Sequence, residues 1–152
     1  MAIAGLRVGI IGGSIAGCAA AAALIRSGCD AHVFERSSTG LMDRGAGIAI
    51  PGPLRKDLMG KGYLPDEFPN CEMKQRWWQF PDGSSEGRRV WTQATPAFAN
   101  NWGNLWQALR RNVPDQNYHD GKTLLDFDET TDSVSAQFSD CLLYTSPSPR
   151  DS

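Results

Sequence analysis

A glycine-rich turn lies between a short apolar run and an alanine-rich run near the start of the chain. The apolar run covers 6–11 and ends at Gly12-Gly13, a pattern typical of a strand that is buried on both faces of a parallel sheet. The run 14–27 predicts a helix, because it contains five consecutive alanines and is followed by Gly28, a common residue just after a helix end. A second strand is expected over 30–35. Strand, turn, helix and strand within thirty residues predict a right-handed βαβ unit.

The turn has the residues of a dinucleotide-binding fingerprint, with serine at the second glycine position. It reads Gly12-Gly13-Ser14-Ile15-Ala16-Gly17. Gly12 permits the tight turn from strand to helix, and Gly17 lets the helix pack close to the strand. Ser14 stands where the backbone must approach a pyrophosphate, and its hydroxyl can donate to a phosphate oxygen. Because a helix N-terminus also offers free N–H groups and a positive dipole end, we expect these six residues to bind a diphosphate.

Glu35 lies at the end of the expected second strand. At that distance after the turn, a carboxylate accepts hydrogen bonds from the ribose hydroxyls of adenosine. A carboxylate there repels a 2′-phosphate, so the pattern indicates FAD or NAD rather than NADP. The alternative is a glycine turn followed by a solvated glutamate. Strand, turn, helix and Glu35 in register favour the nucleotide site, but these residues alone do not separate FAD from NAD.

The residues that follow supply a resemblance to a known family. The stretches 33–36 (Val-Phe-Glu-Arg) and 44–48 (Arg-Gly-Ala-Gly-Ile) resemble the flavin-dependent aromatic hydroxylases, the para-hydroxybenzoate hydroxylase-like monooxygenases. The resemblance implies that Arg36 flanks the adenosine, Arg44 faces the diphosphate or ribityl region and Gly47 lies near the isoalloxazine. The residue types agree with these roles, since glycines leave room for a ligand and the arginine fork suits a phosphate.

A second stretch strengthens the resemblance. Residues 101–110 and 118–121 resemble the helix and strand that follow the substrate-side part of the family's chain. Trp102 stands where many members carry an arginine or glutamine that touches the flavin side. A tryptophan at this place and a Gly-Gly-Ser turn both resemble the sequences of the 2,6-dihydroxypyridine hydroxylase-like branch. Leu105 and Leu109, one helical turn apart, are expected to be core positions facing the sheet.

The rest of the chain predicts further strands. Runs 72–80 and 88–92 flank Pro81-Asp82-Gly83 and predict a hairpin. We interpret this hairpin, at about 70–95, as a substrate-side insertion, and we expect its three tryptophans to be packing residues. A short helix is expected over 53–60, and two more strands over 124–129 and 133–139.

The chain is therefore expected to be an α/β protein with a Rossmann-like FAD-binding domain over 1–140, incomplete and carrying part of a β-rich insertion. Residues 141–152 read like the translation of a transposon end and a sequencing adapter. We interpret them as a non-native tail and predict no helix or strand for them.

The resemblance implies an FAD-dependent monooxygenase that hydroxylates a small aromatic or N-heteroaromatic molecule. FAD would be bound, and NAD(P)H would be a transient cosubstrate used together with O2. No nucleophile, metal site or carboxylate pair stands out in the sequence, and the catalytic residues are unknown, as expected where the flavin carries the chemistry. Two alternatives are an NAD-dependent Rossmann oxidoreductase, which gives no role to 44–47, and a non-catalytic nucleotide-binding fragment.

Composition narrows the possible partners and compartment. A net charge of −2 and 41% hydrophobic residues are typical of a soluble globular chain and give no footprint for nucleic acid or a membrane surface. The charge-free stretch 8–25 also allows a secretion signal, but glycines interrupt its apolar residues. The four cysteines lack zinc-ligand or disulfide-framework spacing, so we expect reduced thiols and a cytoplasmic protein. The sequence does not indicate an oligomeric state.

Overall fold

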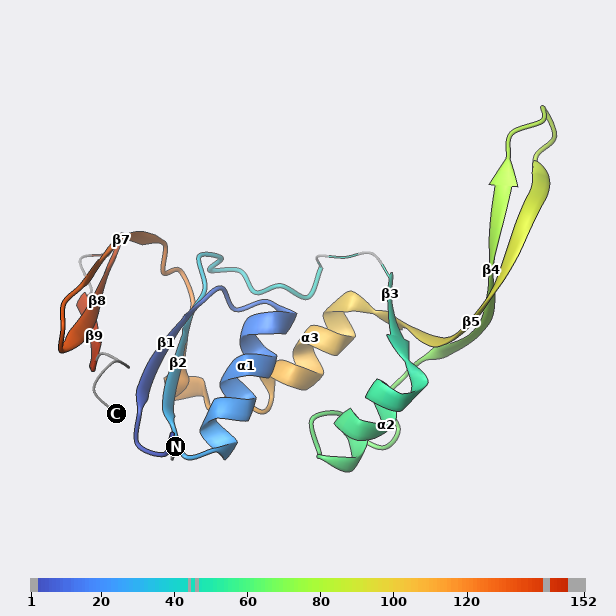
Figure 1. The fold of residues 1–152 in the computed structure, drawn as a ribbon. Coiled ribbons are helices and arrows are strands. Elements are labelled where there is room, and N and C mark those ends of the chain that lie inside the picture. The colour runs from blue at the N-terminus through green and yellow to red at the C-terminus, as the bar shows by residue number, and fades with distance from the viewer. Residues whose placement is uncertain (1–2, 44, 46, 141–142, 148–152) are drawn as a thin grey trace.

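The structure, a computed structural model, describes residues 3–43, 45, 47–140 and 143–147. Its first elements are β1 (Arg7–Ile11), α1 (Ile15–Arg26) and β2 (Asp30–Phe34). β1 and β2 pair in parallel, and β6 (Tyr118–His119) extends this sheet by pairing in parallel with β2. The strand–turn–helix–strand arrangement predicted for the start of the chain is confirmed, and the protein is of mixed α/β class (Figure 1).

Helix α1 packs against the end of β1 with almost no space between their backbones. Gly12 has φ +101°, a conformation that favours glycine. A Cβ atom on Gly17 would lie only 1.8 Å from the carbonyl oxygen of Gly12. The tight turn at Gly12 and the close packing at Gly17 are therefore confirmed as structural requirements.

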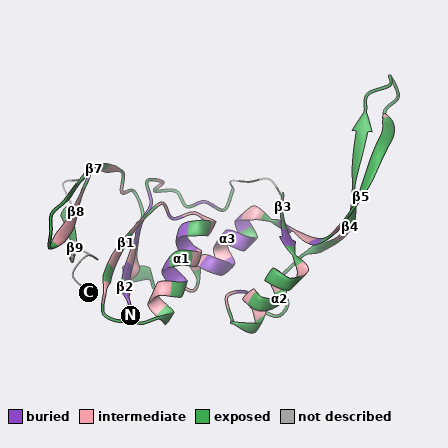
Figure 2. Ribbon diagram, viewed as in Figure 1, coloured by how far each residue is buried: buried purple, intermediate pink, exposed green. Residues whose placement is uncertain are grey.

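A second sheet is antiparallel and has the strand order β3-β5-β4. It is formed by β3 (Gly47–Pro51), β5 (Arg88–Asn101) and β4 (Cys71–Phe80), while α2 (Gly52–Gly60) follows β3 directly. The predicted hairpin is confirmed, but its second strand was predicted to end at 92. β5 continues to Asn101 because its later half pairs with β4 on one side, as far as Ala99, and with β3 on the other. Figure 1 shows the β4–β5 hairpin projecting from the body, and Figure 2 shows that its outer part is exposed.

Two of the three tryptophans of the hairpin pack with each other, the third packs with an arginine, and all three remain about half exposed. Trp78 and Trp91 stack with ring centroids 5.8 Å apart, and the guanidinium of Arg89 lies 3.7 Å from the ring centroid of Trp77. The expectation that they are packing residues is thus met only within the hairpin itself.

A third sheet lies at the opposite end of the molecule from the hairpin (Figure 1). It consists of β7 (Leu124–Glu129), β8 (Ser133–Phe138) and β9 (Leu143–Pro147), all antiparallel. The first two strands were predicted. No strand was predicted within 141–152, but Leu143–Pro147 pairs with β8 through backbone hydrogen bonds, which any sequence without a central proline can make. The interpretation of 141–152 as a non-native tail stays a prediction.

The main core lies between α1 and α3 (Trp102–Arg110), which pack side by side (Figure 2). Leu105 and Leu109 are each 3% exposed, as expected of core residues. They lie in a cluster with Cys18 of α1 and the strand residue Ile50 of β3, and Tyr118 of β6 in the parallel sheet packs against this cluster. The parallel sheet also has a second cluster that includes Val33.

A one-turn 3-10 helix, Asp115–Asn117, connects α3 to β6. Among the described residues, no helix combines the length and the apolar character that crossing a membrane would need.

Replacing Gly17 by alanine tests the packing of α1 on β1. Because the new methyl group would overlap the Gly12 carbonyl, we expect Gly17→Ala to lower the free energy of unfolding by about 1–3 kcal/mol, the usual cost of overpacking. Urea denaturation followed by circular dichroism measures this change. Gly60→Ala is the matched control, since a Cβ on Gly60 at the end of α2 meets nothing within 4 Å. Equal stability of the two variants would contradict the packing role.

Two histidines meet across β2 and β6. His32 Nδ1 and His119 Nε2 are 2.9 Å apart, and His32 Nε2 lies 3.0 Å from Asp30 Oδ1. The His119 ring also stacks on Phe34, with centroids 4.9 Å apart. Partial burial lowers the pKa of His119 below its ordinary value of 6.5, and the neighbouring His32 and Lys122 lower it further, against an opposing effect of Asp120.

This environment predicts an acid-sensitive contribution to stability. The unfolded chain takes up the His119 proton at a higher pH than the folded chain does. The contribution of His119 to the free energy of unfolding is therefore present above about pH 6.5 and is lost as the pH falls through that value. We expect the free energy of unfolding to drop between about pH 7.5 and about pH 5.5, and to drop less in His119→Gln. Equal drops in both proteins, measured by urea denaturation, would assign the acid sensitivity to other groups.

Candidate functional site

The glycine turn presents the N-terminus of α1 at the carboxyl ends of β1 and β2. Ser14 is the N-cap residue of α1, has extended backbone, and its hydroxyl makes no capping hydrogen bond. The first turn of α1 carries no acidic residue. Since the first N–H groups of a helix have no partner inside the helix and lie at its positive end, this end of α1 is suited to an anion.

Glu35 is tied to the turn rather than left at a solvated strand end. Its side chain is buried, at 6% exposed. Oε2 accepts the backbone N–H of Gly13 at 2.7 Å, and Oε1 accepts that of Ser37 at 2.8 Å. A carboxylate has about four acceptor positions, so these two bonds leave room for further donors such as ribose hydroxyls. The alternative of a solvated glutamate is excluded by this burial.

A cavity of about 260 Å³ opens beside Glu35. It brings together three of the predicted residues, Gly12, Glu35 and Arg36, with residues from the segment that follows β6. Its complete lining is Ile11, Gly12, Phe34, Glu35, Arg36, Lys122, Thr123 and Leu124. The cavity therefore lies where the adenosine-binding residues were expected.

Lys122 belongs to this cavity and was not predicted. Its backbone N–H donates to the carbonyl oxygen of Glu35 at 2.8 Å, and its ammonium group pairs with Asp140. No local signal in the sequence indicated it, because the chain returns to Glu35 only through pairing of β6 with β2.

The loop before β3 packs against the start of α3. A Cβ on Gly45 would lie 2.6 Å from Cβ of Trp102, and one on Gly103 would lie 2.2 Å from the carbonyl oxygen of Met42. Gly47 begins β3 and pairs with Asn101, the residue before Trp102. The structure thus brings Gly45, Gly47 and Trp102 together. Arg44 and Ala46 lie outside the described residues, so the predicted role of Arg44 stays a prediction.

Trp106, one helical turn after Trp102, reaches the glycine turn itself and was also missed. Its indole N–H donates to the carbonyl oxygen of Gly13 at 2.8 Å. The spacing of four residues between two tryptophans on one helix was the available signal, because it places both on one face.

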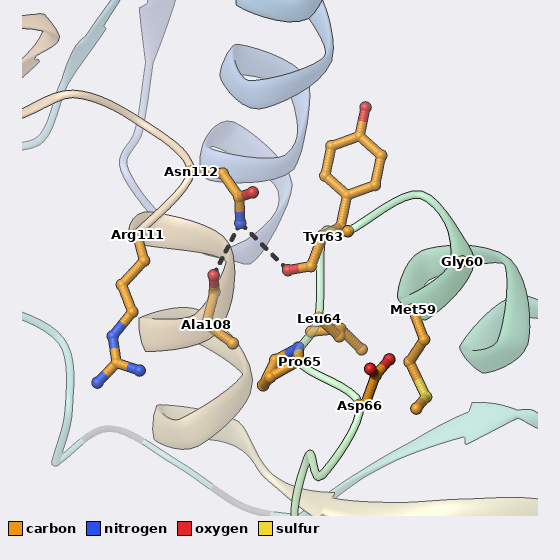
Figure 3. A pocket seen from close by; sticks show the side chains of 10 residues that line it. Met59, Gly60, Tyr63, Leu64, Pro65, Asp66, Ala108, Arg111 and Asn112 are labelled. Atoms are coloured by element: carbon orange, nitrogen blue, oxygen red, sulfur yellow. Dashed lines mark hydrogen bonds between the residues drawn. The ribbon is translucent and has the colours of Figure 1, made fainter.

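Several cavities lie away from Glu35. One of about 620 Å³ includes Trp106, Arg110 and Asp115 in its lining, and the last two side chains pair with each other. Another of about 510 Å³ lies between the end of α3 and the segment after α2, and Figure 3 shows its lining. Asn112 there donates to the carbonyl oxygens of Tyr63 and Ala108, so this amide serves to join loop and helix. A cavity of about 280 Å³ between β1 and the third sheet is mainly apolar and includes Phe34 and Phe127.

Two further observations concern metal ligands and the buried thiol. Among the described residues, no group of three or more histidine, cysteine or carboxylate side chains is placed to hold a metal ion. Burial raises the pKa of the Cys18 thiol to about 11, so this thiol stays protonated and weakly nucleophilic at neutral pH. What remains is an anion-binding helix end beside a cavity with a buried carboxylate.

No family model matches the chain. In sequence it is similar to 2,6-dihydroxypyridine 3-monooxygenase of Paenarthrobacter nicotinovorans, with 28% identity over 136 residues. The match covers 88% of this chain and 33% of that protein. The chain therefore spans about a third of the length of the curated relative it matches.

Solved structures with the same fold include 2,6-dihydroxypyridine-3-hydroxylase from Arthrobacter nicotinovorans, with a TM-score of 0.77 and 24% identity over 93% of this chain and 35% of that one. Klebsiella pneumoniae HpxO, solved with FAD and uric acid, has a TM-score of 0.70 and 18% identity over 93% of this chain and 37% of that one. The predicted resemblance to FAD-dependent aromatic hydroxylases, and within them to the 2,6-dihydroxypyridine hydroxylase-like branch, is confirmed: the chain is similar to part of these proteins in sequence and in fold.

Proposed function

We propose that this chain supplies a Rossmann-type binding site for the ADP half of FAD in an FAD-dependent monooxygenase. The observation that carries the proposal is the buried Glu35 carboxylate beside the N-terminus of α1, with a cavity of about 260 Å³ next to it. A helix end suits the diphosphate, and the free acceptor positions of the carboxylate suit the ribose.

The residues present fit this group. At Gly13 and Gly17 a Cβ atom would overlap neighbouring atoms, so the turn tolerates only glycine where the helix end must stay open. Ser14, Ile15 and Ala16 provide the first amides of α1 for the diphosphate. Bound FAD would supply the redox chemistry, and the residues of this chain would bind and orient it.

The remaining predicted residues are assigned along the cofactor, from the adenosine to the flavin. Arg36 flanks the adenosine, Arg44 faces the diphosphate or ribityl region, and Gly47 and Trp102 lie near the isoalloxazine. The contact of the loop at Gly45 with Trp102 supports grouping these residues in one site.

The proposed reaction is hydroxylation of a small aromatic or N-heteroaromatic molecule with NAD(P)H and O2. It is supported by relatives that are 2,6-dihydroxypyridine hydroxylases and by one solved with uric acid. Because the chain spans about a third of these proteins, the activity is proposed for a protein that carries this site together with the remaining two thirds. The cytoplasmic location expected from the cysteine pattern stays a prediction.

Titration with parts of the cofactor tests the assignment. We expect the chain to bind FAD and ADP but not FMN, which lacks the AMP half. ADP carrying a 2′-phosphate is expected to bind more weakly than ADP, because Glu35 repels the added charge. Calorimetric titration measures all four ligands. Binding of FMN with no binding of ADP would place the nucleotide elsewhere and refute the proposed site.

Glu35→Ala is expected to weaken ADP binding by about ten- to a hundredfold, since losing a hydrogen bond to a charged group costs about 1.5–3 kcal/mol. Circular dichroism checks that the variant folds. Glu72→Ala, on the exposed part of β4, is the control and should bind as the unaltered chain does.

A second ligand separates ribose binding from support of the turn, because Glu35 also holds Gly13. If the carboxylate accepts from the ribose, 2′-deoxy-ADP binds the unaltered chain more weakly than ADP, and Glu35→Ala shows no such difference. A cycle of this kind isolates the pairwise contact. The same deoxy effect in both proteins would show that Glu35 does not touch the ribose.

A further inference from the structure

Three side chains converge on one backbone carbonyl, that of Gly13. The indole N–H of Trp106 donates to it at 2.8 Å, the phenol of Tyr118 at 3.1 Å and the thiol of Cys18 at 3.2 Å. Trp106 and Tyr118 lie 93 and 105 residues away in the sequence, on α3 and β6. The peptide that follows β1 is therefore fastened to two elements outside the βαβ unit.

The space around Gly13 shows how closely the donors approach. A Cβ on this residue would lie 2.1 Å from the Tyr118 hydroxyl and 2.8 Å from Cβ of Glu35. The guanidinium of Arg110 lies 4.1 Å from the centroid of the Tyr118 ring, which holds the ring in place from its other side. Burial, with the charge of Glu35 nearby, raises the pKa of Tyr118 to about 12, so its phenol remains a donor throughout the neutral range.

Holding this carbonyl also sets the direction of the next N–H group. None of the peptide bonds described is cis, and in a planar trans peptide the C=O and the following N–H point in opposite directions. The Gly13 carbonyl points toward Trp106 and Tyr118. The N–H of Ser14 therefore points away from these two side chains, at the open N-terminal end of α1.

We propose that Trp106 and Tyr118 are positioning residues of the nucleotide site, which aim the Ser14 N–H and the first turn of α1 at the diphosphate of a bound nucleotide. They act through the Gly13 carbonyl and do not touch the ligand. This inference rests on the proposed function, in which the turn binds the diphosphate of an ADP moiety.

Two variants remove one donor each and keep an aromatic ring: Trp106→Phe and Tyr118→Phe. In the 152-residue chain, we expect each to raise the Kd of ADP by about 2- to 10-fold, as loss of a neutral hydrogen bond implies. Adenosine, which lacks the diphosphate, is expected to change by less than about twofold. A merely structural role would weaken both ligands alike. Calorimetric titration of ADP and adenosine measures the two affinities.

Amide hydrogen exchange without ligand provides the second readout. We expect the Gly13 amide to exchange faster in both variants, while the amides of β4 and β5 exchange as before. Trp91→Phe in the hairpin and Tyr63→Phe in the segment after α2 (Figure 3) are matched controls that should leave exchange at Gly13 and ADP affinity unchanged.

The outcomes separate this inference from the proposed function. If the unaltered chain binds ADP and both variants match the controls, or lose ADP and adenosine equally, the positioning role is overturned and the nucleotide site stands. If the unaltered chain binds neither ADP nor FAD, the proposed function fails and the positioning role fails with it. Should Trp106→Phe not fold, Tyr118→Phe decides the question alone, because it removes a single oxygen atom.

Discussion

Helix α1 can approach the end of β1 only as closely as the two glycines on either side of the turn allow. A side chain at Gly17 would overlap the carbonyl oxygen of Gly12, so the backbones are in contact at this point. The peptide between them has no freedom to move without moving the helix. Side chains from three other elements, Glu35 after β2, Trp106 on α3 and Tyr118 on β6, reach Gly13 in this turn. The direction in which α1 points, and with it the position of any bound diphosphate, depends on this one constraint.

The burial of Glu35 has a physical cause in the same place. An ionised carboxylate that is 6% exposed would be costly without partners. Two backbone N–H groups, those of Gly13 and Ser37, offset that cost, and the positive end of α1 lies beside it. The carboxylate thereby stabilises the turn and still retains acceptor positions that face the cavity. Glu35 would therefore have two roles, support of the turn and binding of the ribose.

Local patterns in the sequence predicted the elements whose cause is local. The alternation of strand, glycine turn, alanine helix and strand was sufficient for β1, α1 and β2, and the Pro81-Asp82-Gly83 turn was sufficient for the hairpin. The same patterns placed Glu35 at the site through its distance from the turn. They failed where a neighbouring element decides the structure: β5 runs on past residue 92 because β4 and then β3 lie beside it, and Leu143–Pro147 becomes a strand because β8 lies beside it. Trp106, Tyr118 and Lys122 were missed for that reason too, since only the tertiary fold brings them to the turn.

Helix α3 relates the two ends of the proposed cofactor site. Trp102 and Trp106 lie one helical turn apart, a rise of about 5.4 Å, on one face of the helix. Trp102 packs on the loop at Gly45, and Trp106 holds the carbonyl of Gly13. Because α3 is a rigid element whose core residues are buried against α1, the spacing between the loop at Gly45 and the turn at Gly13 follows from the geometry of a single helix.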